Sequence, residues 1–492
     1  MGGNKIESLL TFDELLESVY GKYIGFARSS SPFYFSSVAT DSRNVKEGSL
    51  FVPLLGESQD GHKYIPQALE AGATVVFVTA SVYEKNSKYY LGLAGENLDK
   101  TFIVVENNMK ALQDAARAYV QKFPKLIKIG ITGSSGKTTT KEILASVLRQ
   151  KYNVVATEGN FNSETGLPLS VFNIRSEHEV GVFEMGMNRE NEIGEIARVL
   201  APNYAIITNI GSAHIGILGS RENIAKEKRK IFNYIKEDGA AFIPDGDDFA
   251  NFISEGVKGR VVRFGKDVPE TQSGVSFISN DGLEGTRFAI DGLESRLSLP
   301  GIYNYTNALA CVALAKILGL SAAEIKKGIE SVQSLGGRSN IVAVNTKKDS
   351  KGESKKVMLM YDCYNANPDS MEKALGLCAS LEIKGRMIFI LGDMKELGEK
   401  SAEEHSRIGA LATLSKPDLI VFVGPEMANG AKAAKLSGFG NVQYFPTADV
   451  DKVSDFVLNY VHDDDFILLK ASHSLNFDLI AKKLDSREAL SA

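Results

Sequence analysis

The feature that most constrains the fold of this chain is an alternation between short Val- and Ile-rich runs and longer helical stretches. The runs 126–131 and 204–208 are apolar and short enough to be buried strands, whereas 109–122 and 304–318 have helical patterns. Strands that alternate with helices predict parallel sheets of the α/β class. The stretch 264–300 interrupts this alternation with Gly, Asp and Ser, and it predicts antiparallel strands.

The length of 492 residues predicts about three domains at roughly 150 residues each. Pro124 lies between a predicted helix and a predicted strand, and Leu335-Gly336-Gly337 follows another helix. The polar run 347–356 is too charged for a core and predicts a hairpin loop. We therefore expect an N-terminal domain at 1–123, a central domain at 124–334 and a C-terminal domain at 335–492.

Charge and cysteine content exclude several classes of protein. The 56 Lys and Arg against 61 Asp and Glu give a net charge of −5, which argues against a nucleic-acid partner. Cys311, Cys363 and Cys378 form no CxxC pair, as expected for a reducing compartment rather than a disulfide framework. No apolar run reaches the ~18 residues of a membrane span, and acidic residues lie where a signal peptide is apolar. We expect a cytoplasmic protein without membrane insertion.

The segment 130–140, with the sequence GITGSSGKTTT, joins a predicted strand to a predicted helix. Glycines let backbone N–H groups surround a phosphate, and the helix N-terminus adds its positive dipole. A lysine supplies charge to the β/γ-phosphates, and the following hydroxyl can bind Mg²⁺. Ile131 occupies the first glycine position of the usual spacing, so this is a shorter variant of the loop. The expected ATP-binding residues are Gly133, Ser134, Ser135, Gly136, Lys137, Thr138 and Thr139.

Two further strands end in groups that can bind metal. Glu184 ends the run 180–184, and His214 follows the run 204–208 after a short loop. Ligands gather beyond the carboxyl ends of strands in doubly wound sheets, so both side chains are expected near Lys137. Carboxylate oxygens suit Mg²⁺, and one histidine is tolerated beside substrate oxygens.

Several motifs together resemble the Mur ligase family. They are YNANPDSM at 364–371, GDMKELG at 392–398, NFN at 160–162 and EMG at 184–186, with DSR at 41–43, GSLF at 48–51 and DGH at 60–62 near the N-terminus. Within the family, they are most similar to the branch that adds D-alanyl-D-alanine to UDP-N-acetylmuramoyl-tripeptide. The resemblance implies an N-terminal α/β uridine-nucleotide domain, a central P-loop ATPase-like parallel sheet and a C-terminal Rossmann-like domain.

The resemblance also implies a reaction. ATP phosphorylates the substrate carboxylate to an acyl phosphate, the amine of D-alanyl-D-alanine attacks it, and phosphate leaves as the amide forms. The expected cofactors are ATP and Mg²⁺, and we expect a monomer. Positioning and charge stabilisation are the main tasks of the protein in such chemistry.

Residue roles follow from the same resemblance. Lys137, Glu184, His214 and Lys228 are expected to be catalytic. Thr138 and Glu184 would bind one metal, and His214 would bind a second beside a carbamylated lysine. Lys228 is assigned as that lysine because the Ile231-Phe232 that follows it matches the family pattern. The remaining expected contacts are Asn304 with adenine, Arg338 with phosphates, Asp362 with ribose, and Ser42, Arg43, Asn160, Asn162, Asn365 and Asn367 with substrate.

Three positions depart from the family pattern. Tyr303 replaces a common His, Tyr361 replaces a common acid, and His473 replaces an Arg, which removes a permanent bidentate anion ligand. The alternatives are a diamino-acid-adding muramyl ligase, whose Asp-Asn-Pro-Arg motif is missing, a folylpolyglutamate synthase-like ligase, and a silent nucleotide-binding regulator. The sequence leaves open the third residue of the accepted tripeptide.

Overall fold

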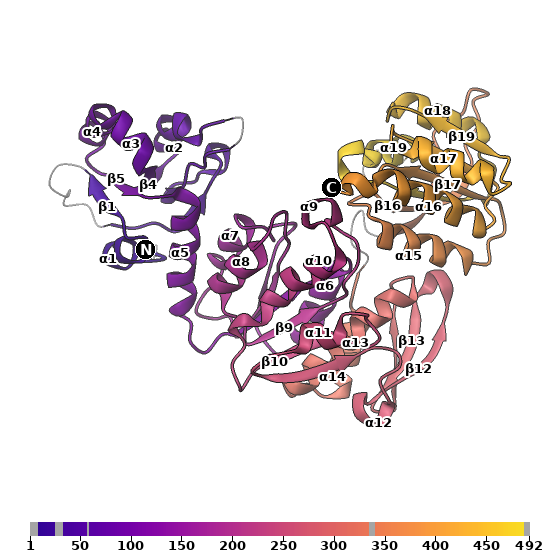
Figure 1. Ribbon diagram of the computed structural model, residues 1–492, viewed down its shortest axis with the longest axis horizontal. Helices are drawn as coiled ribbons and strands as arrows, with labels where there is room; N and C mark the ends of the chain where they lie inside the picture. Colours follow the sequence, from indigo (N-terminus) through magenta and orange to yellow (C-terminus); the bar gives the residue numbers. More distant parts are fainter. Residues whose placement is uncertain (1–7, 25–32, 57–58, 334–339, 487–492) are drawn as a thin grey trace, which may run out of the picture.

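A computed structural model describes residues 8–24, 33–56, 59–333 and 340–486. Four sheets follow one another along the chain, and Figure 1 shows the N-terminal part, the central part and the C-terminal part arranged in an open arc. The expected α/β class is confirmed. Within the described ranges, no helix combines the length and the apolarity needed to cross a bilayer.

The first sheet has the strand order β1-β5-β4-β3-β2, in which only β1 is antiparallel to its neighbour. β4 is buried along its whole length, so helices cover both faces of the sheet. Its elements are α1 (Phe12–Ser18), β1 (Lys22–Ile24), β2 (Ser37–Ala39), β3 (Ser49–Phe51), α2 (Ile65–Glu70), β4 (Ala73–Thr79), α3 (Ala80–Lys85), α4 (Ser87–Glu96), β5 (Thr101–Val105) and α5 (Asn108–Gln121).

Helix α5 joins the first sheet to the central sheet. One face of α5 is apolar, and a single apolar core runs from α1 through α5 to α7 and α8 of the central part. Polar contacts support this packing: the Tyr119 hydroxyl donates to the Ile174 carbonyl at 2.6 Å, and Arg198 pairs with Asp114 at 2.8 Å. The N-terminal part is therefore packed firmly on the central part.

The central sheet is parallel, with the order β11-β10-β9-β6-β8-β7. The chain places β7 and β8 on one side of β6 and β9 to β11 on the other, so β6 lies at the switch point where ligands bind in such sheets. The elements are β6 (Ile127–Thr132), α6 (Lys137–Leu148), β7 (Val154–Ala156), α7 (Gly166–Val171), β8 (Val180–Glu184), α8 (Glu192–Leu200), β9 (Tyr204–Ile207), α9 (Ile215–Leu218), α10 (Arg221–Arg229), β10 (Ala240–Pro244), α11 (Ala250–Ser254) and β11 (Arg260–Phe264).

A small antiparallel sheet follows, as expected for the stretch 264–300. It shares an apolar core with α6 and with helices α13 and α14, which pack on α6. The elements are α12 (Glu270–Ser273), β12 (Val275–Asn280), β13 (Thr286–Ile290), β14 (Leu293–Leu297), α13 (Ile302–Ile317) and α14 (Ala322–Glu330).

The last sheet has the order β15-β16-β20-β17-β18-β19. β15 and β16 form the hairpin predicted around 347–356, and the remaining pairs are parallel. Two apolar cores cover its faces. The elements are β15 (Asn340–Asn345), β16 (Lys356–Asp362), α15 (Pro368–Ala379), β17 (Met387–Gly392), α16 (Ser401–Leu414), β18 (Leu419–Val423), α17 (Met427–Leu436), β19 (Val442–Phe445), α18 (Val450–Tyr460), β20 (Phe466–Lys470) and α19 (Phe477–Leu484).

The packing of α14 on α6 supports the helix that begins at the phosphate loop, and it requires a glycine. A Cβ atom at Gly328 would overlap the backbone of Val147 on α6. We expect Gly328→Ala to lower the free energy of unfolding by ~1–3 kcal/mol, because overpacked cores must shift. Gly376 on α15 is the matched control, since it has open space around it; Gly376→Ala should raise stability by ~0.5–1 kcal/mol. Urea denaturation of both variants measures the difference, and equal effects would contradict the packing argument.

Candidate active site

A cavity of about 430 Å³ lies between the central part and the C-terminal part of the molecule. It opens at the carboxyl end of β6, where the phosphate loop begins, and the loop before α15 forms part of its opposite wall. Most of the residues expected at the site meet there. They are Ser134, Ser135, Gly136, Lys137, Thr139, Asn160, Asn162, Glu184, His214, Asn304, Asp362, Asn365 and Asn367.

The phosphate loop requires glycine at two positions. Gly133 and Gly136 have φ of +154° and +83°, values that side chains disfavour. A Cβ at Gly133 would overlap Thr208, and one at Gly136 would lie 2.9 Å from the Asn307 amide. Lys137 begins α6, and its Nζ donates to the Gly133 carbonyl at 2.9 Å. The loop therefore has the closed backbone path that a phosphate site needs.

Asn209, which follows β9, holds this loop in place. Its backbone carbonyl accepts from the Ser134 N–H at 3.1 Å, and its side-chain oxygen accepts from the Ser135 N–H at 3.1 Å. Its amide nitrogen donates to the Ser135 carbonyl at 2.9 Å. Sequence reasoning did not find this role, because nothing local to Asn209 indicates that β9 lies beside β6.

Glu184 is a buried acid of the site, and it is only 1% exposed. One carboxylate oxygen accepts from the Thr138 hydroxyl at 2.6 Å and the other from the Asn162 amide at 2.7 Å. A hydroxyl and a carboxylate at this distance, next to a phosphate loop, form an oxygen-rich pair that fits Mg²⁺. Within the described residues, no group of three or more His, Cys, Asp or Glu could hold a metal. A cation here would therefore need oxygens from phosphates or water as further ligands.

His214 lies on the other side of the cavity, at the start of α9. Its φ is +67°, and its Nδ1 lies 2.5 Å from a carboxylate oxygen of Glu396 on the C-terminal part. Burial lowers the pKa of His214 below its ordinary value, the Lys228 and Lys137 charges lower it further, and Glu396 opposes them. The ring is therefore favoured in its neutral form, in which one nitrogen can bind a metal.

Lys228 is buried on α10, with 1% of its surface exposed, and it does not line the cavity. Its Nζ lies 3.9 Å from the Met187 sulfur. Burial holds the pKa of Lys228 well below its usual range, and the charge of Lys137 adds to this effect.

The neighbours in sequence have other partners. Arg229 donates to the Glu255 carbonyl, and Lys230 pairs with the buried Glu227 at 2.7 Å. Neither Arg229 nor Lys230 is among the groups that shift the pKa of Lys228. The charge responsible is Lys137, which is distant in sequence.

Buried carboxylates on α8 and α10 fix the loops beside Glu184. Glu192 accepts from the backbone N–H groups of Glu164 at 2.9 Å and Asn188 at 2.5 Å, and Glu227 accepts from those of Asn191 and Ile193 at 2.9 Å. The Glu192 contacts join the loop 157–165 to the loop 185–191, and both loops line the cavity.

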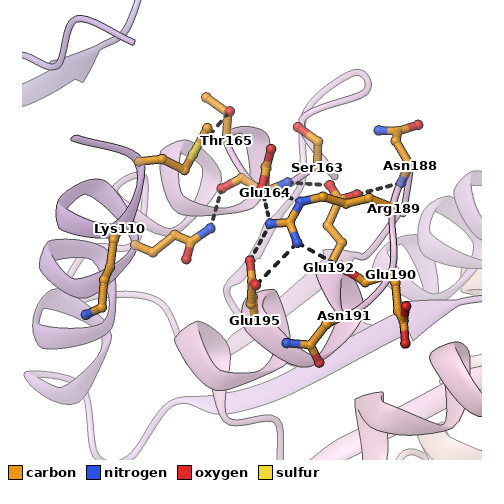
Figure 2. Close-up of polar contacts among 12 residues, drawn as sticks. Lys110, Ser163, Glu164, Thr165, Asn188, Arg189, Glu190, Asn191, Glu192 and Glu195 are labelled. Carbon is orange, nitrogen blue, oxygen red and sulfur yellow. Dashed lines mark hydrogen bonds and ion pairs between the residues drawn. The ribbon is translucent and has the colours of Figure 1, made fainter. Parts of the chain in front are cut away.

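An ion-pair cluster lies beside these contacts on the surface. Figure 2 shows Arg189 pointing toward both Glu164 and Glu195, to which its guanidinium donates. These pairs raise the pKa of Arg189 further above its ordinary value, so it stays charged. On the exposed side, this cluster links the same two loops that Glu192 links in the interior.

Two of the residues expected to contact nucleotide, Asn304 and Asp362, line the cavity. Asn304 donates to the Pro300 carbonyl at 2.8 Å, and Tyr303 lines the cavity beside it. Asp362 ends β16 and accepts from the buried Lys470 at 2.5 Å. Tyr361, in contrast, accepts from Asn340 on the neighbouring strand and does not line the cavity. Arg338 and the Leu335-Gly336-Gly337 boundary lie outside the described residues.

Two residues expected to contact substrate also stabilise the local backbone at the start of α15. Asn367 caps α15 by accepting from the Ser370 N–H at 2.9 Å, and the Asn365 side chain accepts from the Ala366 N–H at 2.8 Å.

His473 lies near the Tyr364 ring, with ring centroids 6.3 Å apart, and it does not line the cavity.

Ser42 and Arg43 are not part of this cavity. Both belong to the N-terminal part, where the Ser42 hydroxyl donates to Gln67 at 3.0 Å. Arg43 pairs with Asp41, and its side chain is 80% exposed. The structure therefore separates these two residues from the phosphate loop.

Comparison with known proteins identifies the family. A model described as "Mur ligase family, catalytic domain" matches residues 34–120, "Mur ligase middle domain" matches 131–315, and "Mur ligase, glutamate ligase domain" matches 322–473. The chain belongs to the Mur ligase family.

Individual relatives are similar over nearly their whole length. The UDP-N-acetylmuramoyl-tripeptide–D-alanyl-D-alanine ligase of Treponema pallidum is 40% identical, over 95% of this chain and 97% of that protein. A crystal structure of MurF from Acinetobacter baumannii has a TM-score of 0.80 at 29% identity, covering 96% of this chain and 98% of that one. One of MurF from Thermotoga maritima in complex with ADP has a TM-score of 0.73 at 26% identity, covering 91% and 96%.

In this Mur ligase, the Glu192 contacts predict a difference between two glutamates of α8. Glu192→Gln replaces one accepting oxygen by an NH₂ group that faces a backbone N–H. We expect the free energy of unfolding to fall by about 1–3 kcal/mol, the cost of a buried unpaired donor. Glu195→Gln, which weakens only the partly exposed pair with Arg189, should cost less than about 1 kcal/mol. Chemical denaturation checks both values, and a larger loss in Glu195→Gln would refute this ranking.

Proposed function

We propose that this protein is an ATP-dependent amide ligase that adds D-alanyl-D-alanine to UDP-N-acetylmuramoyl-tripeptide during the synthesis of peptidoglycan precursors. The observation that carries the proposal is one cavity lined both by the phosphate loop and by the Tyr364-Asn365 segment of the C-terminal part. The 40% identity to the Treponema pallidum ligase over almost the whole chain favours this branch over the diamino-acid-adding and folylpolyglutamate alternatives.

In this proposal, the phosphate loop holds the phosphates of ATP. Backbone N–H groups of Gly133 to Thr139 would bind the phosphates, and Lys137, whose Nζ donates to the Gly133 carbonyl, would supply a positive charge to them. Lys137 stabilises the charge that develops as the γ-phosphoryl group passes to the substrate carboxylate. Asn304 and Asp362 hold the adenosine end.

Mg²⁺ would be held by Thr138 and Glu184, whose oxygens already meet, and it would neutralise phosphate charge. Asn162 keeps the second oxygen of Glu184 oriented. For a second cation we propose His214 and a carbamate on Lys228. The depressed pKa of Lys228 supports this assignment, because only a neutral amine forms a carbamate and a carbamate supplies the oxygen that a hard cation prefers.

The uridine nucleotide is proposed to bind the N-terminal part, near Ser42 and Arg43, with the peptide end reaching Asn160 and Asn162 at the cavity. Asn365 and Asn367 are proposed to face the dipeptide side. Domain boundaries at 123/124 and 334/335, a monomeric state and a cytoplasmic location belong to the same proposal.

Phosphate release tests the function directly. We expect release from ATP only when UDP-N-acetylmuramoyl-tripeptide and D-alanyl-D-alanine are both present, with the pentapeptide product identified by mass spectrometry. Lys137→Ala should lower turnover by about 10²–10³-fold, since it deletes a cation at the transferring group, while its melting temperature stays near the wild-type value. Release without the dipeptide, or near-normal turnover of Lys137→Ala, would refute the assignment.

Substitutions of two lysines on α10 test the carbamate separately. We expect Lys228→Ala to be nearly inactive and partly restored by acetate, which replaces the missing anion. Lys226, two residues earlier and exposed, is the matched control, and Lys226→Ala should keep the wild-type rate. Isotopically labelled bicarbonate should give a carbamate resonance in the wild-type protein and in Lys226→Ala but not in Lys228→Ala. Full activity of Lys228→Ala, or the same resonance in all three proteins, would contradict the carbamate.

A further inference from the structure

A lysine of the C-terminal part reaches the phosphate loop of the central part. Lys373 lies on α15, and its Nζ donates to the Ser135 hydroxyl at 2.8 Å. Lys373 also lines the cavity. Neither the motifs of the sequence nor the proposed nucleotide contacts include this residue.

The position of Lys373 is set by a second contact on the same helix. Asp369, four residues earlier, accepts from both the N–H and the hydroxyl of Ser212, at 2.6 and 2.8 Å. A Cβ at Gly211 would overlap this carboxylate, so the glycine permits the close approach. Residues four apart lie on one helix face. One face of α15 therefore contacts both the loop after β9 and the loop after β6.

These two loops form one unit. The Gly211 N–H donates to the Ser134 hydroxyl at 2.9 Å, and Asn209 holds Ser135. The Asp369 contact consequently fixes the distance between α15 and the phosphate loop. It places the Lys373 ammonium beside the Ser135 side chain of that loop.

The Lys373 charge lacks a close acidic partner. Among the residues that the structure describes, its hydrogen bond is to the neutral Ser135 hydroxyl, and no carboxylate forms an ion pair with it. Burial lowers the pKa of Lys373, whereas the more distant charges of Asp369, Asp247 and Glu372 raise it. A largely buried ammonium with only a hydroxyl partner is costly unless an anion binds beside it.

We infer that Lys373 is a phosphate-binding residue that the C-terminal part contributes to the terminal phosphate of ATP. Lys137 lies two residues beyond Ser135 and is the loop cation that approaches the β/γ-phosphates. An ammonium seated on Ser135 lies at the same end of a bound nucleotide. The inference rests on the proposed function in taking ATP as the ligand of this loop.

Nucleotide selectivity tests this inference. The dissociation constants of Mg²⁺ complexes of a non-hydrolysable ATP analogue and of ADP are measured by calorimetry on the full chain. We expect Lys373→Met to weaken the ATP analogue about tenfold and ADP less than about twofold, as for loss of one charge-assisted contact to the third phosphate. Lys373→Arg should keep most of the selectivity. Lys432→Met, at an exposed position on α17, is the matched surface control.

A double-variant cycle separates phosphate binding from mere support of the loop. If Lys373 acts only by holding Ser135, the effect of Lys373→Met disappears in a Ser135→Ala background, which overturns the inference; if it binds phosphate, the selective loss persists there. Equal weakening of both nucleotides, or no weakening, also overturns it. These measurements need neither the uridine substrate nor the dipeptide. A wild-type protein that selects ATP through Lys373 but releases no phosphate would therefore count against the proposed function alone.

Discussion

The buried carboxylate of Glu184 is the constraint on which the arrangement of the site depends. A carboxylate removed from water is costly unless its oxygens are hydrogen-bonded. Here the partners are Thr138 of the phosphate-loop helix, Asn162 of the loop after β7, and, for its backbone N–H, the hydroxyl of Thr157. The hydrogen bonds of this one residue thus fix α6, β8 and the loop after β7 relative to one another. The same geometry leaves two oxygen atoms, on Thr138 and Glu184, close enough to share a cation.

The three parts of the chain are joined by different kinds of contact. The N-terminal part shares an apolar core with the central part through α5, which is typical of a permanent interface. The C-terminal part contacts the central part through polar pairs, such as Asp369 with Ser212 and His214 with Glu396, and through a small apolar contact of Ile215 on α9. Exposed polar pairs contribute little to stability, so we expect these surfaces to separate at a lower cost than the shared core around α5. Substrate groups bound between them would add contacts to both parts.

Much of the fold and part of the site could be predicted from the sequence, because they rest on local patterns. The Val-rich runs marked the strands, and GSSGK with its flanking strand and helix marked the phosphate loop. Asn209, Glu192 and Lys373 could not be found in this way, since each acts on a segment more than 25 residues distant in sequence. The position of β6 beside β9 brings Asn209 to the phosphate loop, the pairing of β7 with β8 brings Glu192 near Glu164, and the contacts of α15 bring Lys373 to Ser135. Ser42 and Arg43 carried a motif, but no pattern showed how far they lie from the cavity.

The charges around Lys137 explain why several of these residues depend on one another. Its ammonium lowers the pKa of Lys228, of His214 and of Glu396, although these groups come from three different elements. Lys137 therefore places a positive charge near Lys228 and His214 in a partly buried space, which disfavours a further proton on either group. A bound polyphosphate would compensate this charge, and a carbamate on Lys228 would replace a neutral amine by an anion. Occupation of the phosphate loop and the ionisation of the neighbouring groups are for this reason one coupled equilibrium.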